Sequence, residues 1–197
     1  MHGLINRSIQ CFLRDTYGQA LWGLVALKAD LPAEGFEPML PYPDVLSVAV
    51  LNAASVELGR PRQTLLEDMG TYLVSHPNQL RLRRLLRFGG LSFEDFLHSL
   101  EQLRDRGELA VPGLDLPMLE LREDEPERFC VICRSAHPEI GHVLVGLLRA
   151  MADDYGALVL LEHGGTLDGA ELIWVDLLDP SHAEGRRFDL SARELSS

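Results

Sequence analysis

The sequence predicts an α+β fold in which a helical half, residues 1-106, precedes a sheet half, residues 112-179. Up to about Arg106 the apolar residues recur every three or four positions, which is the period of a helix. After Pro112 they alternate in short runs, which is typical of strands. The second half is therefore expected to be an antiparallel sheet with one long crossing helix, followed by a polar C-terminal tail over 180-197.

Breaks rich in proline and glycine divide the helical half. Helical spacing predicts six helices, at 4–13, 20–29, 44–59, 61–76, 78–88 and 92–106. Asp44 is expected to cap the first turn of its helix, because a carboxylate accepts hydrogen bonds from free amides there. Ser92 followed by Asp95 predicts a capping box at the last helix.

The sheet half begins with two strands on either side of a charged turn, 122–127. Helical spacing returns over 139–155 and ends at Gly156. A hairpin is expected to follow, with its turn at His163-Gly164-Gly165. The predicted strands are 116–121, 128–134, 157–162 and 171–177.

The charge balance argues against several classes of partner. Eighteen basic and thirty acidic residues give a net charge of -12, which repels nucleic-acid phosphates and anionic membrane surfaces. No apolar run approaches the roughly 20 residues of a spanning helix, and no signal peptide is recognisable. Three cysteines cannot all pair within one chain, which fits a reducing compartment. We therefore expect a cytoplasmic protein that binds neither nucleic acid nor membrane.

Motifs for catalysis are not found in the sequence. It contains no HExxH pattern, G-x-S-x-G elbow, P-loop or dinucleotide fingerprint, so we do not expect an enzyme. One charged cluster, formed by Arg81, Arg83, Arg84 and Arg87, is either a docking face for an acidic partner or the solvated side of a helix.

Several short segments, taken in their order and spacing, resemble one known family. They are Met1-His2-Gly3-Leu4-Ile5-Asn6, Tyr17-Gly18 with Trp22, Tyr42 with Asp44, Ala53-Ala54-Ser55 with Leu58, and Phe96-Leu97-x-x-Leu100-x-x-Leu103 before Pro112-Gly113 and Pro117. The chain from Met1 to about Asp179 resembles the heme-nitric oxide/oxygen binding family, H-NOX (HNOB), whose best-known member is the regulatory domain of soluble guanylate cyclase.

This resemblance implies one H-NOX-like domain over 1-179 that binds heme and senses nitric oxide or oxygen. Such a sensor passes a shape change to a separate signalling enzyme, such as a histidine kinase or a cyclic-di-GMP enzyme. The length leaves no room for a fused output domain, so a stand-alone sensor or regulatory module is expected.

The functional positions of the family are only partly retained. Where the family has a Leu-His pair that ligates iron, this chain has Leu103-Arg104, and a guanidinium has no lone pair to donate. His98 lies about 120° round a regular helix from position 104, so it does not replace that ligand. Ile5 and Pro117 match apolar positions that contact the porphyrin.

The family's propionate-binding Tyr-x-Ser-x-Arg aligns with residues 133–137, where only the serine is retained. The resemblance therefore gives, as heme-contact positions, Ile5, Arg104, Pro117, Cys133, Arg134, Ser135 and His137. Heme ligation is expected to be altered or lost. Arg134 supplies the missing cation if the turn is shifted by one residue.

Two other interpretations remain open. In the first, the pocket is filled or binds something other than heme, and Arg104, with Arg134 and His137, either holds an anionic ligand or pairs within the chain. In the second, Cys130, Cys133, His137 and His142 form a zinc site or a thiol redox switch. A regular strand points Cys130 and Cys133 to opposite faces, which favours two buried cysteines instead.

Overall fold

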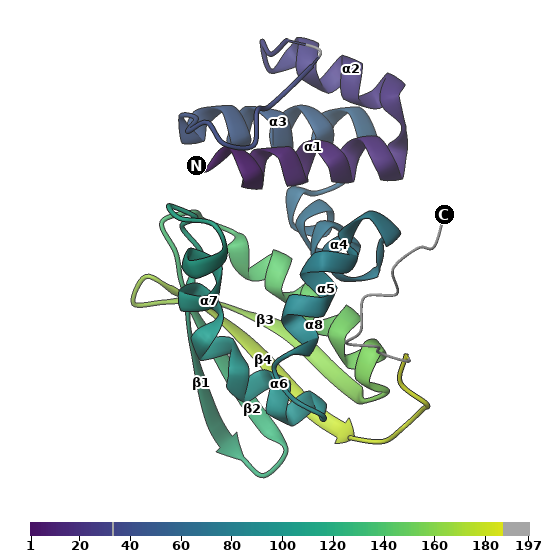
Figure 1. The fold of residues 1–197 in the computed structure, drawn as a ribbon, viewed down its shortest axis with the longest axis vertical. Coiled ribbons are helices and arrows are strands. Elements are labelled where there is room, and N and C mark those ends of the chain that lie inside the picture. Colours follow the sequence, from purple (N-terminus) through teal and green to yellow (C-terminus); the bar gives the residue numbers. More distant parts are fainter. Residues whose placement is uncertain (33, 187–197) are drawn as a thin grey trace, which may run out of the picture.

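The computed structural model describes residues 1–32 and 34–186. Residues 187–197 of the expected polar tail lie outside this part. The elements are α1 (Gly3–Tyr17), α2 (Gln19–Lys28), α3 (Asp44–Leu58), α4 (Arg62–Ser75), η1 (Pro77–Gln79), α5 (Leu80–Arg87), α6 (Phe93–Ser99), η2 (Leu100–Gln102), α7 (Leu103–Ala110), β1 (Met118–Glu125), β2 (Arg128–Arg134), α8 (Ile140–Tyr155), β3 (Leu158–Leu167) and β4 (Ala170–Asp179). Figure 1 shows α1–α3 stacked at one end of the molecule, the sheet at the other, and α4 between them.

The helical half has its own apolar core. It forms where α1–α4 turn their apolar faces together around Phe12 and Trp22, which are almost fully buried. Burial of side chains this large supplies much of the energy that holds short helices in place. Ile140, on α8, packs against this cluster and also against the core of the sheet half, so α8 joins the two cores.

The sheet has the strand order β1-β2-β4-β3, and all three pairings are antiparallel. Its inner face is covered by α8 and by α6 with η2, through Phe96, Leu148 and their neighbours. The outer face carries a smaller apolar cluster around Cys130, Ile132 and Ala170. This arrangement confirms the predicted α+β fold, with a helical half followed by a sheet crossed by one long helix.

Two turns lie elsewhere than predicted. β1 continues through the charged residues to Glu125, because an edge strand leaves such side chains in water. The β3–β4 turn is at Asp168-Gly169, where both residues have positive φ, and not at His163-Gly164-Gly165. The Gly-Gly pair instead shifts the register within β3, where a Cβ at Gly164 would contact the Trp174 indole at 2.7 Å.

The helix predicted over 92–106 is interrupted. The Ser92–Asp95 capping box is present and begins α6, but Leu100–Gln102 is a 3₁₀ turn that separates α6 from α7. A 3₁₀ segment turns by 120° per residue, so the angle between a position on α6 and one on α7 differs from the angle in a regular α-helix. Asp44, in contrast, does not cap α3: its carboxylate pairs with the Met1 ammonium group.

Helices α4 and α8 are in backbone contact. A Cβ added at Gly70 would overlap the Val143 carbonyl, and one added at Gly146 would overlap the Glu67 carbonyl. Glycine is therefore needed at both positions for the two helices to approach this closely. No helix in the described ranges is long and apolar enough to cross a membrane.

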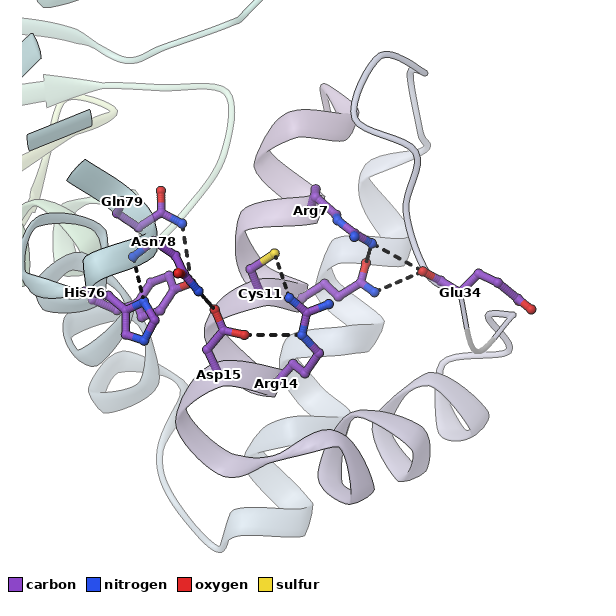
Figure 2. A network of polar contacts seen from close by, with 10 residues as sticks. Arg7, Cys11, Arg14, Asp15, Glu34, His76, Asn78 and Gln79 are labelled. Atoms are coloured by element: carbon purple, nitrogen blue, oxygen red, sulfur yellow. Dashed lines mark hydrogen bonds and ion pairs between the residues drawn. The ribbon is translucent and has the colours of Figure 1, made fainter. Parts of the chain in front are cut away.

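A polar network fixes the far end of α4 to α1 (Figure 2). The Asp15 carboxylate accepts hydrogen bonds from the Tyr72 hydroxyl at 2.8 Å and from the Asn78 amide at 3.1 Å, and it pairs with Arg14. Burial raises the pKa of Tyr72 to about 12, so the phenol stays neutral and donates its proton. The network holds α1 against the junction of α4 and η1.

Candidate functional site

Arg104, the residue at the position of the family's heme ligand, does not face an interior pocket. It lies in the first turn of α7 with 47% of its side chain exposed, and its Nη2 lies 3.5 Å from Oδ1 of Asp115, which is itself exposed. The interpretation in which Arg104 pairs within the chain therefore fits the structure. An arginine this exposed and already paired with Asp115 gives no support to the alternative, in which Arg104 holds an anionic ligand inside the old pocket.

The two apolar positions, Ile5 and Pro117, are each half-buried. Ile5 lies on α1, and Pro117 directly precedes β1. Neither residue lines the cavity of about 380 Å³ beside α6, nor does any other of the seven expected heme-contact residues.

The four residues that align with the propionate-binding motif point in different directions. Cys133 is buried in the sheet core, whereas Arg134 is exposed and reaches the Asp168 carbonyl at 3.5 Å. The Ser135 hydroxyl accepts from the His137 amide at 3.0 Å. His137 turns toward Asp44, with its Nδ1 3.6 Å from the carboxylate. These residues do not form one anion-binding cluster, and His137 instead connects the β2–α8 loop to the start of α3.

The predicted zinc site is not formed. Cys133 lies in the inner core of the sheet and Cys130 in the outer cluster, so the two side chains point to opposite faces of β2. The described residues contain no group of three or more His, Cys, Asp or Glu side chains placed to hold a metal. Zinc ligation by Cys130, Cys133, His137 and His142 is therefore contradicted by the alternation of side chains along a strand.

The two strand cysteines also do not suit a thiol switch. Burial raises the pKa of Cys130, and burial together with the Glu171 charge raises the pKa of Cys133 to about 12. A thiol with a raised pKa is a poor nucleophile, because only the thiolate reacts. Both residues behave as small apolar side chains of the sheet.

Each of the seven histidines already has a structural partner. His2 caps α1, His76 accepts from the Asn78 amide, and His182 lies near Asp179. His98 sits edge-on to Phe129, on the outward side of α6. With His137 placed as described, the remaining two are His142 and His163, which stack on each other.

The stacked pair was not predicted from sequence. The rings of His142 and His163 lie 4.1 Å apart and nearly parallel, and Nε2 of His163 is 2.9 Å from the Glu171 carboxylate. Gly141 makes room for this contact, since a Cβ there would meet both His163 and Glu171. The pair comes from α8 and β3, more than twenty residues apart in sequence, so no local pattern indicates it.

The placement of Arg104 and of the histidines shows whether this chain offers an axial ligand for heme iron. A heme held by a side chain needs an axial donor such as imidazole. The residue at the expected position is an exposed arginine, and the imidazoles within 1–32 and 34–186 are engaged with caps, carboxylates or rings. The residues present therefore do not fit a heme ligated as the family resemblance implies.

Comparisons with known proteins agree on the family. The family model described as Haem-NO-binding matches residues 2–163. Soluble guanylate cyclases 89Db and 89Da of Drosophila melanogaster are each 22% identical over 158 residues, which is 80% of this chain and 24% of each relative. Soluble guanylate cyclase gcy-31 of Caenorhabditis elegans is 22% identical over 154 residues, 78% of this chain and 22% of that relative. The chain spans about a quarter of the length of these curated relatives.

Solved structures share the fold. An Fe(II) unliganded H-NOX protein from K. algicida has a TM-score of 0.76 at 15% identity, covering 96% of this chain and 100% of that one. An oxygen-binding H-NOX domain related to soluble guanylate cyclases has a TM-score of 0.72 at 14% identity, covering 95% and 100%. At this identity the likeness shows the fold alone.

Proposed function

The chain belongs to the Haem-NO-binding family, and on that premise we propose that it is a non-catalytic regulatory module that has lost histidine-ligated heme. The observation that carries this proposal is Arg104. It stands where the resemblance places the iron ligand, it has no lone pair, and its guanidinium is exposed and paired with Asp115.

The neighbouring histidines and Arg134 support the loss of heme ligation over its replacement by another side chain. His98 is the imidazole nearest to Arg104 in sequence, but the 3₁₀ turn η2 separates the two residues and His98 lies on the outward side. His137 is committed to Asp44, and Arg134 lies on the outer side of the sheet. A substitute ligand would have to break one of these contacts.

Regulation without heme requires another input that moves the helical half against the sheet half. The segment best placed for this is η2 with α7, because it is held to the sheet by few polar contacts. One of them is the Glu101 carboxylate, which accepts from the Leu121 amide of β1 at 3.1 Å. A shift of this segment would alter the surface beside β1.

The partner in this proposal is a separate signalling enzyme in the cytoplasm, such as a histidine kinase or a cyclic-di-GMP enzyme. The family resemblance supports this class of partner, as do the relatives, which are named as soluble guanylate cyclases. The basic cluster of α5 does not support a docking face as a whole, because Arg83 is turned inward to a buried aspartate, Asp154.

The decisive experiment is heme reconstitution. The full chain is expressed with added heme precursor, purified by gel filtration and examined for a Soret band, with the iron content measured in parallel. We expect no retained heme. A stoichiometric Soret band in the wild type would overturn the proposal, and its loss in His98→Ala or in His137→Ala would then identify the unusual ligand.

A further inference from the structure

A solvent-accessible cavity of about 380 Å³ lies between the α5–α6 loop and one face of the α6–η2–α7 segment. Such a volume falls within the usual range of small-molecule sites. On the helical side, the lining residues recur at intervals of about three or four positions, and this spacing continues through the 3₁₀ turn. Its lining residues are Phe88, Gly89, Gly90, Asp95, His98, Ser99, Gln102 and Arg106.

Arg106 provides a cation with unused hydrogen-bonding capacity. Its Nη2 donates to the Ser99 carbonyl at 3.3 Å, which fixes the side chain along the cavity wall. Its Nε is buried and has no hydrogen-bond partner among residues 1–32 and 34–186. Because Nε has almost no exposed surface, a carboxylate in the cavity would accept from the terminal N–H groups of the guanidinium, in a charge-assisted hydrogen bond.

Asp95 limits the charge of a ligand. Its carboxylate is occupied at the capping box, where it accepts from the Leu91 and Ser92 amides at 3.1 and 3.0 Å. The backbone hydrogen bond from Ser92 is the largest of the contacts that lower the pKa of Asp95, so this carboxylate stays ionised. One cation and one anion in the lining favour a ligand with a single negative charge over a dianion.

The rest of the lining suits a flat apolar group. Phe88 is 73% exposed at the mouth of the cavity, and the adjacent Leu91 is also exposed, so two apolar side chains face water beside an open cavity. The imidazole of His98 forms a further planar wall, fixed edge-on against Phe129. A Cβ at Gly89 would overlap the Ser99 side chain, so the loop lies as close to α6 as glycine allows.

We propose that this cavity binds a small monocarboxylate with a flat apolar body, in which Arg106 holds the carboxylate and Phe88 covers the body. The ligand would lie against Ser99 and Gln102, at both ends of the 3₁₀ turn, and so would change the position of α7. This movement of α7 rests on the proposed function, because the ligand would then take the regulatory role that the resemblance assigns to heme. Binding itself does not depend on it.

The test uses benzoate and the full chain. Wild-type protein is titrated with benzoate while ¹H–¹⁵N resonances are followed, and we expect a Kd of about 1 mM or tighter, as for a ligand of this size. The largest shifts are expected at Gly89, Gly90 and Gln102. Benzylamine, which has the same flat body and the opposite charge, is expected not to bind. No saturable shifts with benzoate, or equal shifts with benzylamine, would overturn the proposal.

Two matched variants assign the carboxylate to Arg106. Arg106→Gln is expected to weaken benzoate binding at least about tenfold, as for the loss of a charge-assisted hydrogen bond. Arg104→Gln, which removes an exposed arginine two residues earlier on the same helix, is expected to leave the Kd unchanged. Equal loss in both variants, or unchanged binding in Arg106→Gln, would refute the assignment.

Two further measurements check that the Arg106 variant is folded and test whether Phe88 contacts the apolar part of the ligand. If circular dichroism shows that Arg106→Gln is unfolded, Arg106→Lys replaces it and is likewise expected to weaken benzoate binding.

Phe88→Ala is expected to weaken benzoate binding several-fold and to leave acetate binding unchanged. Equal effects on both ligands would contradict the role of Phe88. The heme experiment reads a Soret band, so its failure and a failure of benzoate binding are separate results.

Discussion

Helix α4 packs between the helical half and the sheet half, whereas α7 leads along the chain into β1, and the two helices are held very differently. The backbone of α4 touches that of α8 through Gly70 and Gly146, and its end is fixed to α1 by Asp15. α7 buries only Leu103 and Gly107, and its first turn carries the exposed Arg104–Asp115 pair. Contacts between exposed charges contribute little, whereas close-packed backbones tolerate no added atom.

The difference indicates where this fold is adaptable. Helix α4 is held to α8 by backbone contact, and α5, which follows α4, is held to α8 through the buried Asp154. Helix α7 buries fewer side chains, so we expect a substitution on its exposed face to cost little stability. The exposed arginine at position 104 lies on this less buried helix, where a change of side chain disturbs few contacts. Four substitutions test this comparison.

Asp154→Ala is expected to have the largest effect. Asp154 is fully buried on α8 and accepts from Arg83 of α5 at 2.9 and 2.5 Å. Removing one partner of a buried pair leaves an uncompensated charge and costs about 3–5 kcal/mol. Urea unfolding measures the loss, and Asp153→Ala, at the exposed neighbouring position, should change stability by less than about 0.5 kcal/mol. A small loss in Asp154→Ala would show that α5 is held mainly by apolar contacts.

Gly146→Ala is expected to destabilise the protein by about 2–3 kcal/mol, because the added methyl group overlaps the Glu67 carbonyl and forces α4 and α8 apart. The control is Gly23→Ala in α2, where a Cβ meets nothing within 4 Å. That change should raise stability by about 0.5–1 kcal/mol, through helix propensity. Thermal unfolding followed by circular dichroism distinguishes the two, and a stable Gly146→Ala variant would refute the close contact.

Asp15→Asn is expected to lower stability by about 1–2 kcal/mol at pH 7, because a charged hydrogen-bond acceptor is lost. Burial of Asp15 opposes ionisation, but hydrogen bonds from Tyr72, Asn78 and Arg14 outweigh it and lower the carboxyl pKa. A lowered folded-state pKa gives stability that is present above the unfolded value, near 3.9, and is lost as pH falls through the folded value. The wild-type and Asn proteins should therefore converge in urea unfolding as the pH falls through the folded-state pKa of Asp15. A difference that persists at low pH would contradict the assignment.

Arg104→Gln is expected to have the smallest effect, less than about 0.5 kcal/mol, because the pair with Asp115 is exposed. Urea unfolding with and without 0.5 M salt checks this, and the value should be insensitive to salt within error. A loss above about 1 kcal/mol would show that α7 is held by charge and would remove the contrast with α4.

Much of the fold was predictable because the pattern of apolar residues follows the period of each element. The boundary between helical and sheet halves, the Ser92 capping box and the long helix α8 all follow from local spacing. The β3–β4 turn was misplaced because Gly164-Gly165 is locally a turn signal, whereas the pairing of β3 with β4 continues past it to Asp168-Gly169. Register depends on a partner strand, which local sequence does not specify.

The candidate site was predictable only as a list of residues. Family resemblance located Arg104, Ser135 and His137, but nothing local indicated that Arg104 faces Asp115 or that His137 faces Asp44. The cavity beside α6 leaves a weak sequence signal, since Asp95, His98, Ser99, Gln102 and Arg106 recur at helical spacing. That signal alone does not distinguish a cavity wall from a solvated helix face.

By itself the sequence determined the two halves, the family and the presence of an arginine at position 104, because periodicity, motif order and the identity of a side chain are local properties. Only the tertiary structure decided that Cys130 and Cys133 face opposite sides of the sheet, that His142 stacks on His163, and that Arg106 borders a cavity. Those facts depend on which distant segments pack together, and packing is fixed by the whole chain.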